Sequence, residues 1–447
     1  MHHKLETFDL IISGGVCITP GGAETTDIGL KDGLIAAIGD LGGARAEDLF
    51  EAGGLHVLPG VIDTQVHFRE PGAEHKEDIA TGTAAAALGG VTGVFEMPNT
   101  DPPTTSAAAI AEKCRRAKDR AWVNMAFYVG ATADNVEQLG ELEGLPGCAG
   151  VKIFMGSSTG GLLVGDDATL AQVLANGTRR CAVHAEDEPR LKRRFGIAEN
   201  SGDVSKHPEW RDVETALVAT RRLVGLARGI KRRVHVLHVS TADEMELLAG
   251  YRDTASVEVT PQHLTLSAPE AYERLGTKAQ MNPPIRGSSH REGLWRAVQN
   301  GLVDVVGSDH APHSIEEKEK PYPGSPSGMP GVQTLVPVLL DHVASGNLSL
   351  ERFVDLTSAG AARIFGIAGK GRIAAGYDAD LTIVDLKARR TITNLWIASK
   401  CGWTPYDGLK VTGWPVVTVI AGRIVMREGG LIGEPTGGTF RFLENDG

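Results

Sequence analysis

The central part of the chain repeats one pattern, in which a short apolar segment is followed by an Ala-rich or amphipathic helical stretch such as ETALVATRRLVGLARGI. This alternation indicates parallel strands joined by helices. The candidate strands number eight and cover 61–68, 91–98, 122–130, 150–155, 181–187, 233–240, 256–264 and 303–312. Eight such units in about 250 residues predict an α/β fold, a (β/α)8 TIM-like barrel. The alternative is an open, doubly wound sheet.

The two ends of the chain have a different pattern from the middle. Residues 7 to about 58, and later the stretches RIAAGYDADLTIVDL and VVTVIAGRIVMREGG, contain short β-branched or alternating runs separated by Gly and Asp turns. We therefore predict a small composite β-sandwich domain built from residues 1–58 and 366–447, and a barrel domain built from residues 59–365.

The charge and the cysteine content exclude several kinds of partner. The 45 Lys and Arg against 56 Asp and Glu give a net charge of −11 without a long run of one sign, which argues against nucleic acid or an anionic membrane. The five cysteines form no CxxC pair, so we expect neither a disulfide framework nor a cysteine zinc site. The chain has no long apolar run and its polar start lacks a signal-peptide core. These features predict a cytoplasmic protein with a small-molecule substrate.

The first candidate strand carries polar side chains at alternate positions. Asp63, Gln65, His67 and Arg69 share one parity, and the residues between them form a mainly apolar face that can pack against helices. Polar groups that face a barrel interior require a purpose, and catalytic groups of such barrels lie at the carboxyl ends of the strands. The alternative is the solvated face of an edge strand.

Lys152 lies inside the apolar strand GVKIFM, where a buried lysine is costly unless it is paired or chemically altered. A neutral lysine amine adds carbon dioxide to become a carbamate, whose two oxygens can bridge two metal ions. The alternative is a lysine bound to an internal carboxylate. From the spacing alone both interpretations are open.

Three further candidate residues end separate apolar strands. His184 and His238 are placed as imidazoles that coordinate a metal such as zinc at the barrel mouth, although a single strand histidine is more often structural. His235, of opposite parity to His238, receives the structural interpretation. Asp309 in GSDHAPH can serve as metal ligand and proton carrier. The main signal is that Lys152 and these three residues all end strands in the same topological direction.

The sequence resembles the cyclic amidase branch of the amidohydrolase superfamily, and within this branch the dihydroorotases are the best match. The resemblance spans essentially the whole chain and is carried by LPGVIDTQVHFREPG, HKEDIATG, EMPNT, VKIFMGSSTG, VHAED, LHVSTA, MNPPIR and GSDHAPHSIEEK. It implies a barrel with a β-sandwich made from both chain ends. It also implies a carboxylated Lys152 as bridging ligand, with His184 and His238 on one zinc ion and His67 and Asp309 on a second.

The resemblance further implies a substrate and its binding residues. Arg69, Asn99 and His313 are expected around a substrate carboxylate, with Asn282 of MNPPIR as a further binding residue. Dihydroorotate carries such a carboxylate, whereas hydantoin and dihydropyrimidine ring-openers act on uncharged rings and usually lack this arginine. The expected reaction is the interconversion of (S)-dihydroorotate and N-carbamoyl-L-aspartate in pyrimidine biosynthesis, by a homo-oligomer (dimer or tetramer). The alternatives are an allantoinase, a hydantoinase or dihydropyrimidinase, and a catalytically degenerate scaffold protein.

One position departs from the family pattern. The first strand usually reads Asp-x-His-x-His, and this chain has Gln65 in place of the first histidine. Glutamine is a neutral and weak ligand, so the metal position of His67 and Asp309 loses an imidazole. The centre therefore holds either two ions of unequal affinity or one ion. Asp63 is then an orienting residue for the ligands or a buried turn residue.

Four weaker features complete the prediction. The Pro- and Gly-rich loop 321–334 is expected at the barrel mouth or as a passive connection, and His263 either lines the pocket or is structural. The charged stretches 75–78 and 316–320 are interpreted as solvent-exposed. The stretch 156–160 formally matches the G-x-S-x-G motif of serine hydrolases, but no HGGG-like segment precedes it.

Overall fold

The computed structural model describes residues 7–157 and 162–443, and its central element is a parallel eight-stranded sheet. The strands follow chain order across the sheet: β6 (Val61–Val66), β7 (Val91–Glu96), β8 (Asn124–Gly130), β9 (Cys148–Phe154), β10 (Cys181–His184), β11 (Val234–Val236), β12 (Ala255–Val259) and β13 (Val305–Val306). The backbone of His310, just beyond β13, pairs with β6 through His67 N and Gln65 O and closes the ring. The predicted barrel is confirmed and the open sheet is wrong.

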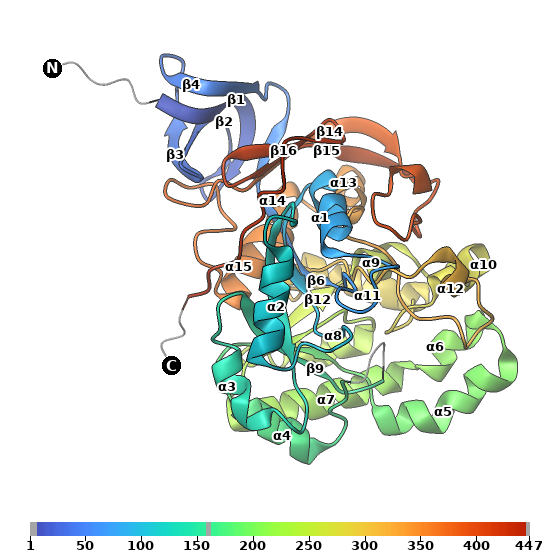
Figure 1. Ribbon diagram of the computed structural model, residues 1–447. Coiled ribbons are helices and arrows are strands. Elements are labelled where there is room, and N and C mark those ends of the chain that lie inside the picture. The colour runs from blue at the N-terminus through green and yellow to red at the C-terminus, as the bar shows by residue number, and fades with distance from the viewer. Residues whose placement is uncertain (1–6, 158–161, 444–447) are drawn as a thin grey trace.

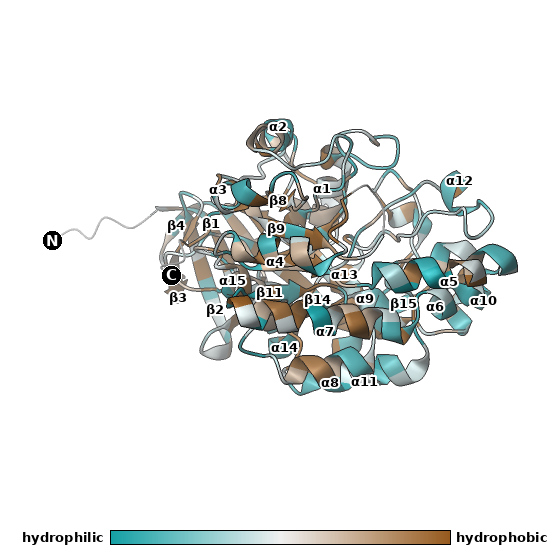
Figure 2. Cartoon of the chain, turned by 90° about the horizontal axis from the view of Figure 1, so that it is seen from below, coloured by the Kyte–Doolittle hydropathy of each residue, from teal (hydrophilic) through white to brown (hydrophobic). Residues whose placement is uncertain are grey.

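Helices surround the barrel (Figure 1). They are α1 (Ile79–Leu88), α2 (Ala107–Ala117), α3 (Leu139–Leu142), α4 (Asp167–Ala175), α5 (Glu188–Ser201), α6 (His207–Trp210), α7 (Val213–Ile230), α8 (Ala242–Ala249), α9 (Pro261–Thr265), α10 (Glu270–Leu275), α11 (Ser288–Gln299), α12 (Ile315–Lys318), α13 (Leu335–Ala344), α14 (Leu350–Val354) and α15 (Gly360–Phe365). Side-chain caps explain several starts, because Asp78, Ser106 and Asp212 each accept a hydrogen bond from the backbone of the first turn. Figure 2 shows hydrophobic and hydrophilic residues interspersed along α7, as expected for a helix with one buried face.

A second, mixed sheet is built from both chain ends, as predicted. Its order is β17-β16-β15-β14-β5-β1-β2-β3, with β4 paired to β1. The strands are β1 (Thr7–Thr19), β2 (Gly22–Lys31), β3 (Leu34–Gly39), β4 (Arg45–Glu51), β5 (His56–Pro59), β14 (Leu381–Thr391), β15 (Lys410–Ile420), β16 (Arg423–Arg427) and β17 (Gly430–Leu431). The two chain ends join where β5 pairs antiparallel with β14 and parallel with β1. The sheet adjoins the barrel on the side of α1 and α13 (Figure 1).

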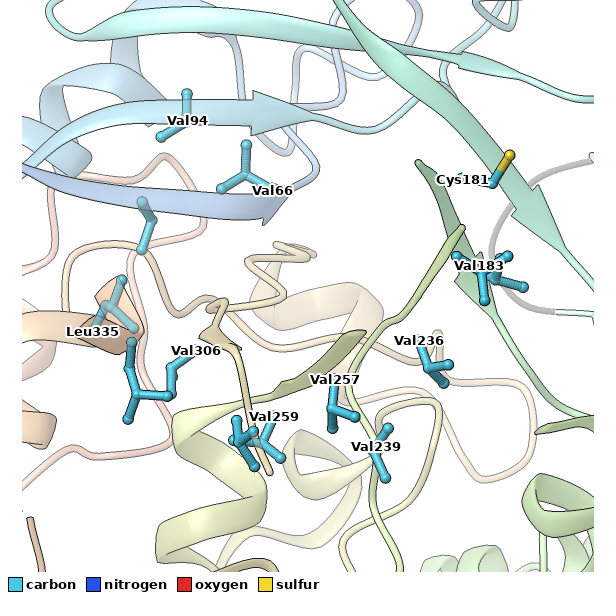
Figure 3. Packing of buried hydrophobic residues seen from close by; sticks show 14 of the residues in the cluster. Val66, Val94, Cys181, Val183, Val236, Val239, Val257, Val259, Val306 and Leu335 are labelled. Atoms are coloured by element: carbon cyan, nitrogen blue, oxygen red, sulfur yellow. The ribbon is translucent and has the colours of Figure 1, made fainter. Parts of the chain in front are cut away.

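The main hydrophobic core lies between the barrel strands and the surrounding helices. Figure 3 shows part of it, with Val66, Val94, Val183, Val236 and Val257 on successive or neighbouring barrel strands. Each of these valines is at most 1% exposed. Branched aliphatic side chains suit parallel strands that are covered on both sides, and this packing holds the strand ends in fixed relative positions.

The C-terminal segment packs against the barrel. This differs from the prediction that all of residues 366–447 belong to the β-sandwich. The backbone of the segment pairs with the start of β8, where Met125 N donates to Gly438 O over 2.8 Å. Phe440 packs edge-on against Phe95 with ring centres 5.0 Å apart. A side chain on Gly93 would collide with the Phe440 ring, so this glycine leaves space for it. Phe440 thus covers the barrel end opposite the carboxyl ends of the strands.

This contact gives a stability prediction. Phe440 is 3% exposed, so Phe440→Ala removes a buried ring and leaves a cavity, which costs about 3–5 kcal/mol. Chemical denaturation should show this loss in the free energy of unfolding. The nearby Leu443 is 59% exposed, and Leu443→Ala should change stability by less than about 0.5 kcal/mol. Equal losses in the two variants would contradict the role given to the Phe440 ring.

Candidate active site

A small cavity opens at the carboxyl ends of the barrel strands. Its lining comes from the ends of six strands and from the loop that carries Asn282, and consists of Gln65, His67, Arg69, Asn99, Lys152, Phe154, His184, His238, Asn282, Asp309 and Ala311. Every predicted site residue except His313 is in this lining. Gln65 and Asp309, 244 positions apart in sequence, are therefore brought together, because parallel strands of a barrel all end at one face.

Lys152 is buried in this cavity without a counter-ion. It is 1% exposed, its Nζ lies 4.4 Å from the centre of the Phe154 ring, and it makes no hydrogen bond or ion pair with any residue that the structure describes. Burial lowers its pKa to about 7. The two other fully buried lysines differ, because Lys113 pairs with Glu96 and Lys318 binds two backbone carbonyls. The alternative of a Lys152 paired with an internal carboxylate is thus wrong for the described part of the chain.

His184 and His238 face each other across the cavity floor. Nδ1 of His184 lies 3.0 Å from Nε2 of His238. Burial lowers the pKa of both imidazoles, which keeps them neutral as metal ligands must be. Two nitrogens that share one tetrahedral zinc lie roughly 3.3 Å apart, given Zn–N bonds of about 2.0–2.1 Å. The observed pair is close to that separation.

A second group of cavity residues is arranged around Asp309. Oδ1 of Asp309 accepts a hydrogen bond from Gln65 Nε2 over 2.9 Å and lies 3.2 Å from His67 Nε2. The other ring nitrogen of His67, Nδ1, contacts Asn99 Oδ1 at 2.8 Å. Burial raises the pKa of Asp309 to about 7. Asn99 therefore orients His67 in addition to facing the cavity.

The donor set fits a metal ion only with a contribution from Lys152. Within residues 7–157 and 162–443, no three His, Cys, Asp or Glu side chains are arranged to hold an ion by themselves. Lys152 lies in the same cavity lining as the His184–His238 pair and as Asp309. A carbamate on Lys152 would supply oxygen ligands to both groups. Oε1 of Gln65 is buried and accepts no hydrogen bond from any described group, so it is a further oxygen ligand.

The backbone is strained at three cavity residues. Arg69, His238 and Asp309 have φ values of 60°, 39° and 45°, in the left-handed region that non-glycine residues rarely adopt. Each such residue costs about 1–3 kcal/mol and persists where surrounding contacts determine it. The strain turns these three side chains toward the cavity just after their strands end, and it is typical of functional sites.

A β-bulge changes the predicted alternation along the first strand. The pairing of β6 with β7 shifts register between Asp63 and Val66. Thr64 and Gln65 consequently both reach across the barrel, Thr64 to Glu258 over 2.6 Å and Gln65 to Asp309. Asp63 accepts hydrogen bonds from the backbone of Ser308 and of Gln65, at 2.9 and 3.2 Å. Asp63 therefore connects the first strand to the segment that carries Asp309. This contact agrees with the interpretation of Asp63 as a residue that orients the ligands.

Arg69 is buried and aimed into the cavity without a carboxylate partner. It is 5% exposed, its Nε donates to Pro312 O over 3.1 Å, and its Nη2 lies 3.2 Å from His313 Nε2. No described carboxylate lies within ion-pair distance of it, and Glu70 instead pairs with Arg116 and Arg120. The alternative of a rim ion pair with Glu70 or Asp63 is wrong. His313 supports Arg69 from behind and is absent from the cavity lining.

Several other expectations are resolved by the structure. His235 and His263 are structural, because they bond to Ser256 and to backbone carbonyls respectively. The interpretation of the charged stretches as solvent-exposed is wrong for Glu77 and Lys318, each 0% exposed. Glu77 contacts Ser399 and His310, which joins the β-sheet part to the barrel. These two residues lie in runs of charge whose composition hides their burial.

The loop 321–334 lies at the barrel mouth, as the first of its two interpretations expects. Pro323, Ser325 and Ser327 line an open groove beside the cavity, and Asn282 lines both. Buried Lys318 anchors the loop through Pro326 O. Ser158, the serine of the G-x-S-x-G match, lies outside the described residues.

Comparison of this sequence with known proteins supports the interpretation of the cavity as an active site. The model of the amidohydrolase family matches residues 56–425. The chain belongs to the amidohydrolase family. Similar curated proteins include a dihydroorotase of Methanothermobacter thermautotrophicus, 36% identical over 431 residues and 95% of each chain, and an allantoinase of Rubrobacter xylanophilus, 37% identical over 448 residues and 97% of each chain.

Solved structures of this family have the same architecture. An L-hydantoinase (dihydropyrimidinase) of Arthrobacter aurescens superposes with a TM-score of 0.91 at 31% identity, covering 97% of this chain and 99% of its own. The chain is a hydrolase that acts on C–N bonds of cyclic amides, and its dihydroorotase and hydantoinase relatives are generally metal-dependent. No helix in the described ranges is long and apolar enough to span a membrane.

Proposed function

We propose that this amidohydrolase is a dihydroorotase, which interconverts (S)-dihydroorotate and N-carbamoyl-L-aspartate in cytoplasmic pyrimidine biosynthesis. The observation that carries the proposal is Arg69, a buried guanidinium that faces the cavity and has no carboxylate partner among the described residues. A buried cation of this kind favours an anionic substrate group, and its planar fork matches a carboxylate. Burial lowers the pKa of Arg69 only to about 10, so it stays charged at neutral pH.

The proposed metal centre uses the cavity residues in two groups. His184 and His238 would hold one metal ion and His67 and Asp309 a second, with a carboxylated Lys152 as a ligand for both and Gln65 as a weak oxygen ligand beside His67 and Asp309. Zinc is the metal that these imidazole and carboxylate ligands suit. A bound zinc ion would supply hydroxide at neutral pH and polarise the amide carbonyl.

The side chains then direct the reaction. Arg69 binds the substrate carboxylate, Asn282 and Asn99 border the ring, and the amide bond is thereby held next to Asp309. Asp309 accepts the proton of the attacking water and passes it to the leaving ring nitrogen. A group in this role must both accept and donate a proton near neutral pH. Ring closure follows the reverse sequence.

The proposal is tested by the substrate preference of wild type and Arg69→Met. Wild type should open L-dihydroorotate and leave allantoin and dihydrouracil essentially unchanged. In Arg69→Met, kcat/KM for dihydroorotate should fall about 10²-fold, mainly through KM, because the substrate carboxylate loses its charged partner. Arg69→Lys, which keeps the charge but not the fork, should lie between the two. Activity of wild type on an uncharged ring alone would show that the allantoinase or hydantoinase alternative is correct.

Activation should depend on pH through Lys152. Only the neutral amine adds carbon dioxide, and a pKa of about 7 leaves it mostly protonated at pH 6 and mostly neutral at pH 8. Reconstitution of metal-free protein with zinc, at a constant concentration of dissolved carbon dioxide, should therefore be roughly tenfold faster at pH 8 than at pH 6. Equal rates at both pH values would contradict carbamate formation on Lys152.

We also infer a homo-oligomer and a division into parts near residues 58 and 366. Leu395 supports the oligomer, because it is 99% exposed beside the paired rings of Trp396 and Trp414. The division is supported by β5 (His56–Pro59), which belongs to the mixed sheet, and by β6, which starts the barrel at Val61. Sedimentation velocity of wild type and Leu395→Asp tests the oligomer.

A further inference from the structure

The two ring nitrogens of His184 have different partners. Nδ1 lies 3.0 Å from Nε2 of His238, whereas Nε2 lies 2.9 Å from Oε2 of Glu186. This distance is within hydrogen-bond range, although the N–H direction is not aligned well enough to make a full hydrogen bond. Glu186 is 0% exposed, so solvent does not compete for this contact.

Glu186 is itself held in place by Arg211. The guanidinium contacts both carboxylate oxygens, with Nη2 2.6 Å from Oε2 and Nε 3.1 Å from Oε1. The same Nη2 donates to Ser157 O over 2.7 Å, in the segment that follows Lys152. Arg211 is 2% exposed, and its own carbonyl is bonded by buried Arg286. The pair thus joins the end of β9, the end of β10 and the segment before α7.

The other two imidazoles of the cavity lack such a partner. His67 has the neutral amide of Asn99 at its outer nitrogen. His238 Nδ1 is buried and has no hydrogen bond from or to a described residue. A carboxylate behind a metal-binding imidazole fixes its tautomer and orientation and makes the inner nitrogen a stronger ligand. Among the described groups, only His184 has that arrangement.

We propose that Glu186, held by Arg211, is a positioning residue that keeps the proton of His184 on Nε2 and presents Nδ1 to the metal. The His184–His238 side is consequently the tighter metal position, and the side with Gln65 is the weaker one. This inference rests on the metal centre of the proposed function, but not on the identity of the substrate. In the sequence HAED, the sequence pattern assigns a role only to the histidine. The proposal adds Glu186 as a second functional residue.

The first test is a zinc titration of metal-free protein against a chromophoric chelator. In Glu186→Gln, the affinity for the first zinc equivalent should fall 10- to 100-fold. The matched control is Glu244→Gln, which makes the same change at a buried carboxylate whose hydrogen bonds, among the described residues, come from Thr220, Thr241 and Ser240. The control should bind zinc like wild type. Unchanged affinity in a folded Glu186→Gln protein would overturn the proposal.

The second test needs no change at Glu186, so it remains decisive if that variant fails to fold. Histidine-labelled wild type is examined by ¹⁵N NMR with zinc bound, and the His184 signals are assigned by comparison with His184→Gln. The expected result is a protonated Nε2 and an unprotonated Nδ1. A proton on Nδ1 would overturn the proposal. Wild type that binds zinc but does not open dihydroorotate would contradict the proposed function alone.

Discussion

Asp309→Asn is expected to lower kcat for dihydroorotate about 10³-fold while the protein keeps its tighter zinc equivalent. The substitution preserves the size of the side chain and its contacts to Gln65 and His67, but an amide does not carry a proton from water to the leaving nitrogen. Proton transfer by a positioned side chain typically contributes 10²–10⁴-fold. Steady-state kinetics and metal analysis of the same preparation measure both quantities.

The matched control for this variant is Asp304→Asn. Asp304 is also a buried aspartate close to β13, but it pairs with Arg252 at the far end of the strand and does not line the cavity. It should lose some stability and keep wild-type kcat. An Asp309→Asn protein with more than a tenth of wild-type kcat would contradict the proton-carrier role.

Lys152→Ala is expected to weaken both metal positions at once. Without Lys152 the described His, Cys, Asp and Glu side chains do not form a three-ligand site, so zinc content should fall by at least half and kcat about 10³-fold or more. Acetate or propionate should restore part of both, because a small carboxylate can occupy the space of the lost carbamate. Metal analysis and activity with and without the added acid test this.

Lys318→Met provides the comparison for a buried lysine outside the metal centre. Burial lowers the pKa of Lys318 to about 7 as well, but its ammonium binds the carbonyls of Gln280 and Pro326. This variant should lose stability and retain its zinc. If Lys152→Ala retained full zinc content, the bridging role of Lys152 would be wrong.

The barrel and most cavity residues are predictable from the sequence for one physical reason. Lys152, His184, His238 and Asp309 are polar residues at the ends of apolar strands, and a parallel barrel brings all such ends to one face. Neither the family resemblance nor a contact map is needed to expect them near one another. The position of Gln65 is likewise predicted, and the structure adds that its amide bonds to Asp309.

The residues that support the site are less predictable, because their contacts are set by loops. His313 lies behind Arg69 rather than on the cavity wall, since the strained backbone at Arg69 turns the guanidinium inward. Arg211 lies between two helices and has no periodic signal that would place it beside Glu186. The only sequence signal for Glu186 is that HAED continues with charged residues just after a strand that ends in a histidine.

In the proposed function, a metal centre around Lys152 is required for the opening of dihydroorotate. The most direct measurement is the rate of L-dihydroorotate opening by purified wild type, before chelation, after chelation, and after reloading with zinc and bicarbonate. We expect activity that is lost on chelation and returns on reloading, to a greater extent with bicarbonate than without it. Activity that survives complete metal removal, or no activity in the fully reloaded protein, would contradict it.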